Sequence, residues 1–391
     1  MKFEDIKIES QAAFMPTYAR YDFAPVRGQG ATLYDENSKD FIDFTSGIGV
    51  NALGYGHPAW VKAVGEQAAS LQHISNLYYA PAQTKLAKKL VEASGFAGVF
   101  LANSGAEANE CAIKLARKYS FDKYGQGRGK IVSLENSFHG RTLSTLKATG
   151  QEDFHKYFYP FPQGFAYTPP NDIEALKNAL TPDVCALIIE IIQGEGGVLP
   201  LDSDFIKAAR RLTHERDILL IMDEVQTGLG RTGKLFAWEY IGQKPDVLTA
   251  AKGLGNGLPI GACLCSEELK NVLGPGDHGS TFGGNPIASA GATVVLDSLT
   301  EEFMADVMAK GQLLGRMLAE IPIVEEVRGM GLMLGIKLKN IKAKDLAAKC
   351  LQEGLLVLTA KENLRLLPPL NISREEIETG MQRLKKAAGS I

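Results

Sequence analysis

The sequence predicts an α/β protein with a large domain on a mostly parallel sheet and a small α+β domain. Short apolar runs alternate with amphipathic stretches in the middle of the chain, which is typical of a parallel sheet covered by helices on both faces. The two ends of the chain lack this alternation. With 391 residues, 45% of them hydrophobic, the chain is long enough for two or three domains with a sizeable core.

The expected central strands follow one another with helical patterns between them. Apolar residues at helical spacing predict one helix over residues 106–119 and another over 204–216. The strands are expected at residues 99–102, 131–134, 184–192, 218–222, 246–251 and 261–265. The run 184–192 is almost entirely apolar and β-branched, which favours a strand buried on both faces.

The ends of the chain show other patterns. Residues 1 to about 50 are rich in proline and glycine turns. Beyond about residue 285, one helical pattern runs to Leu299 and another to Glu320. The tail mixes short strands with helices, an α+β pattern, with strands at 332–338, 355–358 and 364–367 and helices near 343–353 and 374–387.

Charge and composition narrow the function classes. Lys plus Arg number 42 and Asp plus Glu number 45, and this net charge of −3 argues against a basic nucleic-acid binder and an acidic disordered chain. The most apolar stretch is far shorter than the roughly 20 residues of a membrane span. The opening MKFEDIKIES lacks the apolar core of a signal peptide. The five cysteines show no zinc-site spacing, so we expect a reduced, cytoplasmic protein that binds no metal. From the charge balance and the short apolar stretches, we expect that it binds neither nucleic acid nor a membrane.

A first candidate site is the turn NSGAEAN at residues 103–109, between a predicted strand and a predicted helix. The first N–H groups of a helix have no internal partner, and with the helix dipole they favour a bound phosphate. The alternative is a plain helix cap formed by Ser104.

Two further strands end in charged residues. Asp223 and Glu224 close one apolar strand, and a buried carboxylate needs a cation or donors beside it. Lys252 closes the next strand between small residues. A free lysine has a pKa of about 10.4, so as a nucleophile it must be desolvated or lie near other positive charge. The alternatives are an acidic loop or helix cap, and a surface lysine.

Three loops carry side chains that suit ligand binding. In SFHGRT, Phe138 suits stacking on a flat ring, Arg141 suits a two-fold hydrogen bond to a carboxylate, and His139 suits a structural hydrogen bond. Glu195 lies between glycines in QGEGG, which makes it a mobile carboxylate. The hydroxyl-rich turn at 279–286, with Ser280 and Thr281, is a second candidate phosphate site or else a capped loop.

The segment GLGRTG at residues 228–233 matches the dinucleotide-binding pattern G-x-G-x-x-G. Such a turn opens a helix at once, whereas the residues that follow, KLFAW, offer no clear helix start. We therefore expect a glycine-rich loop beside the site rather than a nucleotide site.

Taken together along the chain, these features match the parts of pyridoxal phosphate. The cofactor has a phosphate, a flat ring, a ring nitrogen that takes an acidic partner and an aldehyde that forms a Schiff base with lysine. The turn at 103–109, Phe138, Asp223 and Lys252 supply one partner for each part.

With these motifs, the chain resembles the class III aminotransferases of fold type I over nearly its whole length. Besides the motifs above, the resemblance includes MPTYAR at 15–20, SNLYY at 75–79 and RLLPPL at 365–370. The phrase FHGR resembles the branch of the family that acts on N2-acetylornithine, because ornithine δ-aminotransferases usually have tryptophan in place of His139. The sequence departs from the family at Ile191, usually proline, and at Ser38, commonly glycine; neither is an expected ligand.

The resemblance implies a cofactor site. Lys252 would hold the cofactor and shuttle a proton, and Asp223 would keep the ring nitrogen protonated. The remaining cofactor contacts would be the phosphate ligands Ser104, Gly105 and Ala106, the stacking residue Phe138, the neighbours Glu224 and Val225, Gln226 on the phenolic oxygen, and Thr281 of the neighbouring subunit.

The resemblance also implies substrate contacts. Arg141 would bind the α-carboxylate of acetylornithine and then the far carboxylate of 2-oxoglutarate, while Arg365 would bind the α-carboxylate of 2-oxoglutarate or glutamate. Glu195 would neutralise Arg365 while acetylornithine reacts, because a bare buried cation costs several kcal/mol. Ser280 would lie near the substrate in a site shared by a homodimer.

We therefore expect a transaminase that moves the terminal amino group of N2-acetylornithine to 2-oxoglutarate in arginine biosynthesis. Its small domain would combine residues 1–50 with 301–391, and residues 51–300 would form the large domain with the start of the connecting helix. Alternative donors are succinyldiaminopimelate, succinylornithine, ornithine and 4-aminobutyrate. More distant alternatives are an NAD-dependent oxidoreductase, which rests on residues 228–233 alone, and a binding protein without activity.

Overall fold

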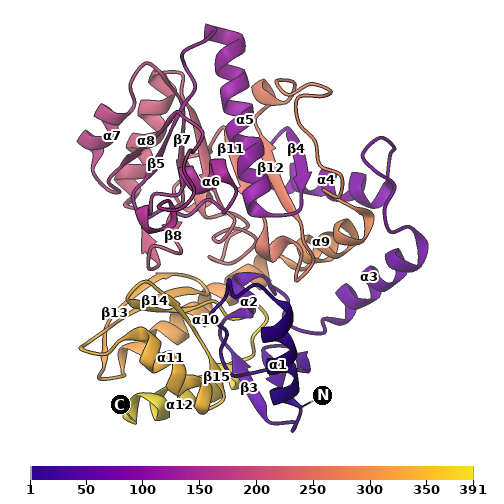
Figure 1. Ribbon diagram of the computed structural model, residues 1–391, viewed down its shortest axis with the longest axis vertical. Coiled ribbons are helices and arrows are strands. Elements are labelled where there is room, and N and C mark those ends of the chain that lie inside the picture. The colour runs from indigo at the N-terminus through magenta and orange to yellow at the C-terminus, as the bar shows by residue number, and fades with distance from the viewer. Residues whose placement is uncertain (1, 391) are drawn as a thin grey trace.

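A seven-stranded sheet forms the centre of the larger part of the molecule, in the upper half of Figure 1. The computed structural model describes residues 2–390. In sheet order the strands are β4 (Gly98–Ala102), β12 (Gly261–Cys265), β11 (Val247–Ala250), β10 (Leu219–Asp223), β7 (Val184–Ile189), β5 (Lys130–Leu134) and β6 (Phe165–Thr168). β12 pairs antiparallel with both its neighbours, and the other pairings are parallel. The expectation of a mostly parallel sheet is confirmed.

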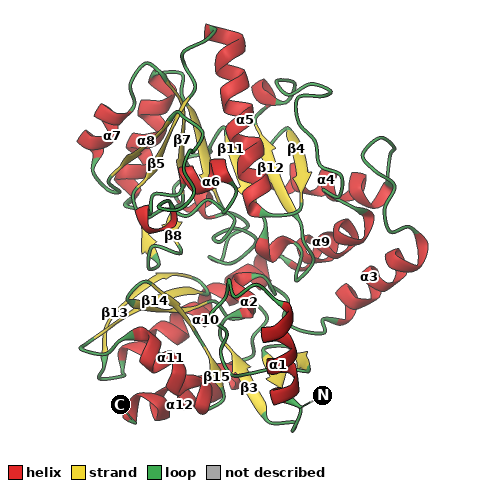
Figure 2. Ribbon diagram, viewed as in Figure 1, coloured by secondary structure: helices red, strands yellow, loops and turns green. Residues whose placement is uncertain are grey.

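Helices cover both faces of this sheet, as expected (Figure 2). On β10, Leu219 and Ile221 pack in one cluster with α5 (Gly105–Tyr124), whereas Leu220 and Met222 pack in another with α8 (Ser203–Glu215). This alternation follows from the two-residue period of a strand. The α8 face also carries α7 (Ile173–Ala179).

The helix α9 (Pro286–Ser298) packs on both α3 (Pro58–Ser70) and α4 (Pro81–Ser94), and α4 also packs on β4. α3 projects away from the central sheet on the right of Figure 1. The shorter helices of this part are α6 (Leu143–Ala148) and the 3-10 helices η1 (Glu152–Phe154), η2 (Ala237–Tyr240), η3 (Lys252–Leu254) and η4 (Glu267–Leu269).

The smaller part contains both ends of the chain. One antiparallel sheet has the order β13 (Val324–Met330), β14 (Met333–Leu338), β17 (Asn363–Leu366) and β16 (Leu358–Ala360). The second has the order β1 (Arg27–Gln29), β2 (Thr32–Tyr34), β3 (Asp40–Asp43) and β15 (Leu355–Leu356). The helices are α1 (Phe3–Ala13), α2 (Ser46–Gly49), α10 (Glu301–Ala319), α11 (Ala343–Gln352) and α12 (Arg374–Gly389).

Contacts between the chain ends hold this smaller part together. Ile42 of β3 pairs with Leu355 of β15 in parallel, across more than 300 residues of sequence. The packing of α12 on Phe44 is close, since a Cβ added at Gly380 would lie 2.3 Å from the Phe44 ring. These contacts support the grouping of the chain ends, while the boundaries at residues 50 and 300 stay predictions.

Two expected strands are wrong in extent. The run 184–192 is not one strand: β7 ends at Ile189, and Ile192 begins β8 (Ile192–Gln193), which forms a small hairpin with β9 (Leu199–Pro200). The chain turns at Glu190, whose carboxylate accepts the N–H groups of Phe138 and Gly194. The expected strand 355–358 is divided between two sheets at Val357, as β15 and β16.

Among residues 2–390, no helix combines the length and apolar character that crossing a bilayer requires. The same residues contain no cluster of histidine, cysteine and carboxylate side chains arranged to hold a metal ion.

Candidate active site

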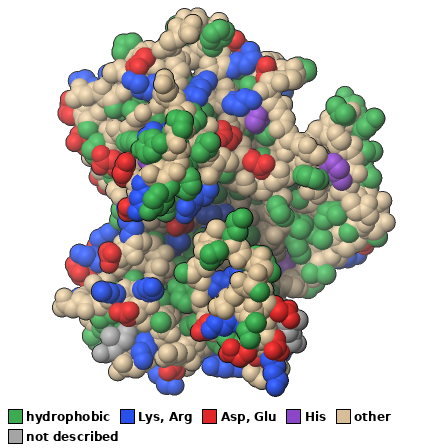
Figure 3. Space-filling model, viewed as in Figure 1, with side chains coloured by type: hydrophobic (Ala, Val, Ile, Leu, Met, Phe, Trp, Pro, Cys, Tyr) green, Lys and Arg blue, Asp and Glu red, His purple; other side chains and the backbone are tan. Residues whose placement is uncertain are grey.

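A cavity of about 410 Å³ lies at the ends of the central strands. This volume is within the range of small-molecule sites. The loops after β4, β5, β10 and β11 line it, with residues Val50, Asn103, Ser104, Gly105, Ala106, Asn109, Phe138, His139, Gly140, Arg141, Glu190, Asp223, Val225, Gln226, Ala251, Lys252, Gly257, Leu258, Pro259 and Ile260. Figure 3 shows a hollow between the two parts of the molecule, with Lys and Arg side chains along its edge.

The first turn of α5 forms one wall of this cavity. Ser104 is the N-cap, and its Oγ accepts the N–H of Glu107 at 3.2 Å. Gly105 is required by packing, because a Cβ there would lie 2.8 Å from both methyl groups of Val225. The free N–H groups at the start of this 20-residue helix therefore face the cavity at Ser104, Gly105 and Ala106, as a phosphate site needs.

Asp223 ends β10 with its side chain toward α5, since it continues the alternation of Leu219 and Ile221. Its side chain is 4% exposed. Its Oδ2 accepts a hydrogen bond from Asn109 Nδ2 at 2.8 Å and lies 2.8 Å from His139 Nδ1. Its Oδ1 accepts the N–H of Val225 at 3.0 Å. The carboxylate is thus buried, fixed and turned to the cavity.

Glu224 does not line this cavity, although the sequence motif suggested a cofactor contact. Glu224 directly follows β10, and its side chain lies on the opposite side of the sheet from that of Asp223. There its carboxylate accepts the N–H groups of Ala237 and Trp238 and the hydroxyl of Thr227. Burial raises the pKa of Glu224 to about 7. The Glu224 side chain therefore holds the start of η2, and a contact of this residue with the cofactor stays a prediction.

Lys252 follows β11 and begins η3 with a φ of +39°. A positive φ is strained for a residue with a Cβ, and such strain is typical of functional sites. Burial lowers the pKa of the Lys252 amine, and Arg365 adds to this, although the carboxylates of Glu195 and Asp223 act in the opposite direction. A lowered pKa is what a lysine nucleophile requires.

Glu195 and Arg365 meet beside this lysine. Arg365, on β17 of the smaller part, donates from Nη1 to Glu195 Oε1 at 2.6 Å and from Nη2 to Oε2 at 3.3 Å. Gln226, which lines the cavity, donates to Glu195 at 3.3 Å and accepts from Arg365 at 3.1 Å. Burial raises the pKa of the Glu195 carboxyl, but the positive charges of Arg365 and Lys252 outweigh burial and hold that pKa below its usual value.

Arg141 lies at the mouth of the cavity on an aromatic surface. Its guanidinium is 5.6 Å from the ring centre of Phe138 and 4.2 Å from that of Phe154. Within residues 2–390 it forms no ion pair, so its fork of donors is available to a carboxylate.

Ser280 and Thr281 do not line this chain's own cavity. Ser280 reaches its edge, because its Oγ accepts a hydrogen bond from the cavity residue Asn103 at 3.2 Å. Thr281 is exposed and lies in a separate small recess with His73, Asn76 and Gln83. This position is compatible with a contact to another subunit.

Sequence reasoning gave no site role to Asn109 and Glu190. Glu190 is 5% exposed, and burial raises its pKa to about 7. A signal for Asn109 was available: asparagine is a poor residue inside a helix, and it lies on the face of α5 that packs on the sheet.

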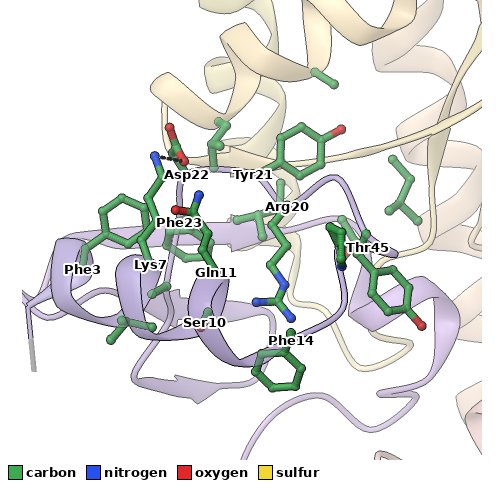
Figure 4. Close-up of a pocket in the computed structure, with 18 of the residues that line it drawn as sticks. Phe3, Lys7, Ser10, Gln11, Phe14, Arg20, Tyr21, Asp22, Phe23 and Thr45 are labelled. Atoms are coloured by element: carbon green, nitrogen blue, oxygen red, sulfur yellow. Dashed lines mark ion pairs between the residues drawn. The ribbon is translucent and has the colours of Figure 1, made fainter.

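A larger cavity, of about 660 Å³, lies beneath α1 in the smaller part (Figure 4). Aromatic and aliphatic side chains line much of it. Its ion pair, between Lys7 and Asp22, has side chains that are 35% and 69% exposed. Two buried carboxylates, those of Glu190 and Asp223, line the other cavity instead.

The residues at the strand ends fit pyridoxal phosphate. The helix start suits its phosphate, Phe138 its ring, Asp223 its ring nitrogen and Lys252 its aldehyde. The packing of Gly105 on Val225 brings the first turn of α5 against the segment after Asp223. These partners therefore surround one small cavity.

This fold and site define an aminotransferase that depends on pyridoxal phosphate. The chain belongs to the aminotransferase class-III family, whose model matches residues 15–388. It is 51% identical over 377 residues to the acetylornithine aminotransferase of Haemophilus ducreyi, with 96% of each chain covered. It is 44% identical to the succinylornithine transaminase/acetylornithine aminotransferase of Pseudomonas aeruginosa, which covers 96% of this chain and 95% of that protein.

A solved structure shows the same fold. The ornithine aminotransferase of Toxoplasma gondii matches with a TM-score of 0.94 and 32% identity, covering 100% of this chain and 96% of that one. The resemblance to class III aminotransferases inferred from the sequence is therefore confirmed.

Proposed function

We propose that this protein moves the terminal amino group of N2-acetyl-L-ornithine to 2-oxoglutarate. The products are N-acetyl-L-glutamate 5-semialdehyde and L-glutamate, and the reaction belongs to arginine biosynthesis. The relative from Haemophilus ducreyi, an acetylornithine aminotransferase, supports this donor. The observation that carries the proposal is the two-fold hydrogen bond of Arg365 to Glu195 beside the cavity.

The Glu195–Arg365 pair allows one site to bind two substrates that differ in their carboxylates. Glutamate carries a carboxylate on its reacting carbon, whereas acetylornithine carries only hydrogen there. A second arginine is needed for glutamate alone, and unpaired it would be a costly buried cation while acetylornithine reacts. Glu195 neutralises Arg365 in that half-reaction and leaves it when 2-oxoglutarate or glutamate binds.

Exposure and backbone support Glu195 as the partner that moves. The Glu195 side chain is 29% exposed and glycines flank it, whereas Arg365 is 3% exposed within β17. Arg141 serves both substrates, by binding the carboxylate of acetylornithine and the far carboxylate of 2-oxoglutarate. Ser280 contributes to the edge of the substrate site.

The other assignments concern the cofactor. Bound pyridoxal phosphate supplies an aldehyde that takes the amino group and a ring that withdraws electrons from the reacting carbon. Lys252 would hold the cofactor through its Nζ and would move the proton of the substrate carbon. Asp223 holds a proton at the ring nitrogen, Phe138 stacks on the ring, Gln226 contacts the phenolic oxygen, and residues 104–106 bind the phosphate.

Side-by-side kcat/KM values for acetylornithine, ornithine, succinyldiaminopimelate, succinylornithine and 4-aminobutyrate test the donor. The expected result is the highest value for acetylornithine. A higher value for ornithine or 4-aminobutyrate would contradict the proposal. Succinylornithine is a second candidate, favoured by the Pseudomonas aeruginosa relative, and changes of pocket contacts shift such preferences by only about 1–3 kcal/mol.

The dinucleotide alternative has no support in the fold. Residues 228–233 form turns, and no α-helix begins there within the part of the chain that the structure describes. Arg231 of this loop is buried and donates to the carbonyl groups of Leu332 and Pro368, which ties the loop to the smaller part. A visible absorption band of the purified protein separates an aminotransferase from a dehydrogenase or an inactive binding protein.

We also propose a cytoplasmic homodimer in which Thr281 binds the cofactor phosphate of the partner subunit. The exposed side chains near Thr281 support an interface, since Leu77, Tyr79 and Phe282 are 87%, 100% and 62% exposed. The five free cysteines support a reducing compartment.

Mixing of two inactive variants tests the dimer. A Lys252→Ala chain and a Thr281→Ala chain should together form heterodimers with one intact site and regain activity. Each variant alone is the control. Heterodimers that form without any gain of activity would contradict the shared site.

A further inference from the structure

Two buried polar residues, Asn109 and His139, contact the carboxylate of Asp223. Asn109 lies on α5 and is 1% exposed, and His139 lies on the loop after β5 and is 2% exposed. Both contact the same carboxylate oxygen, Asp223 Oδ2, at 2.8 Å. Two polar side chains from separate elements, buried and aimed at one atom, form a built arrangement rather than a chance contact.

The orientation of Asn109 follows from its partners. One end of its side chain contacts the carbonyl oxygen of His139 and the carboxylate of Asp223, both at 2.8 Å and both acceptors only. That end must therefore be the NH2 group. The other end, Oδ1, accepts the hydroxyl of Thr249 on β11 at 2.7 Å. The amide is held from three sides and cannot rotate without loss of hydrogen bonds.

The tautomer of His139 follows in the same way. Nδ1 faces a carboxylate oxygen and must carry a hydrogen to bond to it. Nε2 is buried and has no hydrogen-bond partner among residues 2–390. A second proton there would leave a buried donor without an acceptor, so the arrangement suits a ring protonated at Nδ1 alone.

Counting acceptor positions then shows what remains open on Asp223. A carboxylate has about four lone-pair positions. The two donors at Oδ2 fill that oxygen, and the N–H of Val225 takes one position on Oδ1. One position remains, on Oδ1.

We propose that His139 and Asn109 are positioning residues that occupy Oδ2 of Asp223 and so reserve one acceptor position on Oδ1 for the ring nitrogen of pyridoxal phosphate. This inference rests on the proposed role of Asp223. Through it, the loop after β5 and the helix α5, which also stack the ring and bind the phosphate, fix the direction of the third cofactor contact.

The substitution His139→Phe tests this by removing the donor while it keeps a ring. Without the hydrogen bond from His139, Asp223 is held less firmly, and a smaller fraction of the cofactor is protonated at the ring nitrogen. Loss of that positive charge raises the pKa of the other group of the cofactor that binds a proton. The midpoint pH of the visible band of the bound cofactor should therefore rise. The dissociation constant for pyridoxal phosphate, measured by titration of the apoenzyme, should rise about tenfold, as expected for one lost hydrogen bond to a charged group.

The substitution His139→Asn provides a rescue. The Nδ2 of asparagine occupies nearly the same place as the Nδ1 of histidine, so both readouts should return toward the wild-type values. Asn109→Leu should act in the same direction as His139→Phe. A matched control is His155→Phe, because His155 is also fully buried but bonds to the carbonyl groups of Leu146 and Thr149, away from the cavity. This control should leave both readouts unchanged.

A double-mutant cycle with Asp223→Ala decides whether the histidine acts through the carboxylate. In that background, His139→Phe should change neither the midpoint nor the dissociation constant further. Equal effects in both backgrounds, or wild-type values for His139→Phe alone, would overturn the inference. A wild-type protein without any visible band would instead overturn the cofactor assignment itself.

Discussion

The cavity at the strand ends and the cavity beneath α1 differ in the groups that reach them. The cavity beneath α1 is the larger, about 660 Å³ against 410 Å³, but its charged groups are at the surface. In the smaller cavity, Asp223 and Glu190 are at most 5% exposed, and both are held by hydrogen bonds. A buried charge destabilises the fold unless it is paired, so buried carboxylates that line a cavity are candidates for a functional role. Volume alone does not identify the active site.

The largest expected effect is that of Lys252→Ala, at the lysine of the strand-end cavity. Lys252→Ala removes the amine that we propose binds the cofactor, so turnover should fall by several orders of magnitude and the covalent bond to the cofactor should be absent. Pyridoxal phosphate should still bind non-covalently. Steady-state kinetics and mass spectrometry after reduction with borohydride measure both. Near-normal turnover would show that Lys252 is not the nucleophile.

Asp223→Ala should have the next largest effect. Without the carboxylate, the pKa of the ring nitrogen falls, and each unit corresponds to about 1.4 kcal/mol. A fall of a few units slows turnover by several orders of magnitude. The measurement is kcat at saturating cofactor, and a wild-type value would contradict the role. Asparagine is a less clean substitution, since it still forms hydrogen bonds.

The Glu195–Arg365 pair should show a smaller but selective effect. Glu195→Gln should slow the half-reaction with acetylornithine, because Arg365 is then unpaired, and Arg365→Ala should slow the half-reaction with 2-oxoglutarate. Each selective loss should be about 10- to 100-fold, the range of a broken buried charge pair that retains part of its solvation. Stopped-flow traces of each half-reaction measure it. Equal losses in both half-reactions for both variants would mean a static pair.

A pH effect is expected on the other side of the sheet, at Glu224. Its folded-state pKa of about 7 lies above the ordinary value of about 4.3 for an unfolded chain, so the folded protein keeps a proton that the unfolded chain releases. The stability contributed by protonated Glu224 is complete below pH 4 and is lost as the pH rises to 7. The loss of unfolding free energy caused by Glu224→Gln should therefore shrink over this interval, by at most roughly 3 kcal/mol. Urea unfolding at pH 4.5 and pH 7.5 measures the change, and a difference that grows with pH would contradict it.

The smallest effect is expected beneath α1. Lys7→Met removes the ion pair with Asp22 but touches no group of the strand-end cavity. Because exposed ion pairs contribute little, kcat, KM and the melting temperature should all remain at wild-type values. A loss of activity comparable to that of the Glu195 variant would show that the larger cavity also takes part in catalysis.

Much of the strand-end cavity could be predicted from the sequence because its parts are local. Residues at or just after the carboxyl ends of parallel strands lie on the same side of the sheet. This rule places Asp223 and Lys252 together without knowledge of the packing. The helix start at Ser104 is likewise visible as a strand, a turn and a helical pattern. Glu224 shows what motif matching leaves out: it treats neighbouring residues alike, whereas the Glu224 side chain lies on the other side of the sheet from that of Asp223.

The rest depends on long-range pairing. The antiparallel direction of β12 could not be predicted from its five residues, because an apolar strand has the same pattern whether it runs parallel or antiparallel to its neighbours. α1 was missed because none of its residues is buried, so it lacks a strong apolar face. The bonds of Asn109 and His139 to Asp223 join three segments separated by 30 and 84 residues, and no local pattern shows such a meeting.

The strand pair β3 and β15 has a consequence for how the chain is made. On the ribosome, Ile42 emerges early and its partner Leu355 emerges more than 300 residues later. The central sheet from β4 to β12 is by then fully synthesised and can fold as a unit, whereas the sheet of β1, β2 and β3 still lacks its fourth strand, β15. Apolar residues such as Phe41 and Phe44 are exposed during this interval, although they are at most 5% exposed in the finished protein. Synthesis that stops before residue 355 therefore yields a chain in which the cofactor-binding sheet is complete but β3 is paired only with β2, a substrate for chaperones and proteases rather than a smaller enzyme.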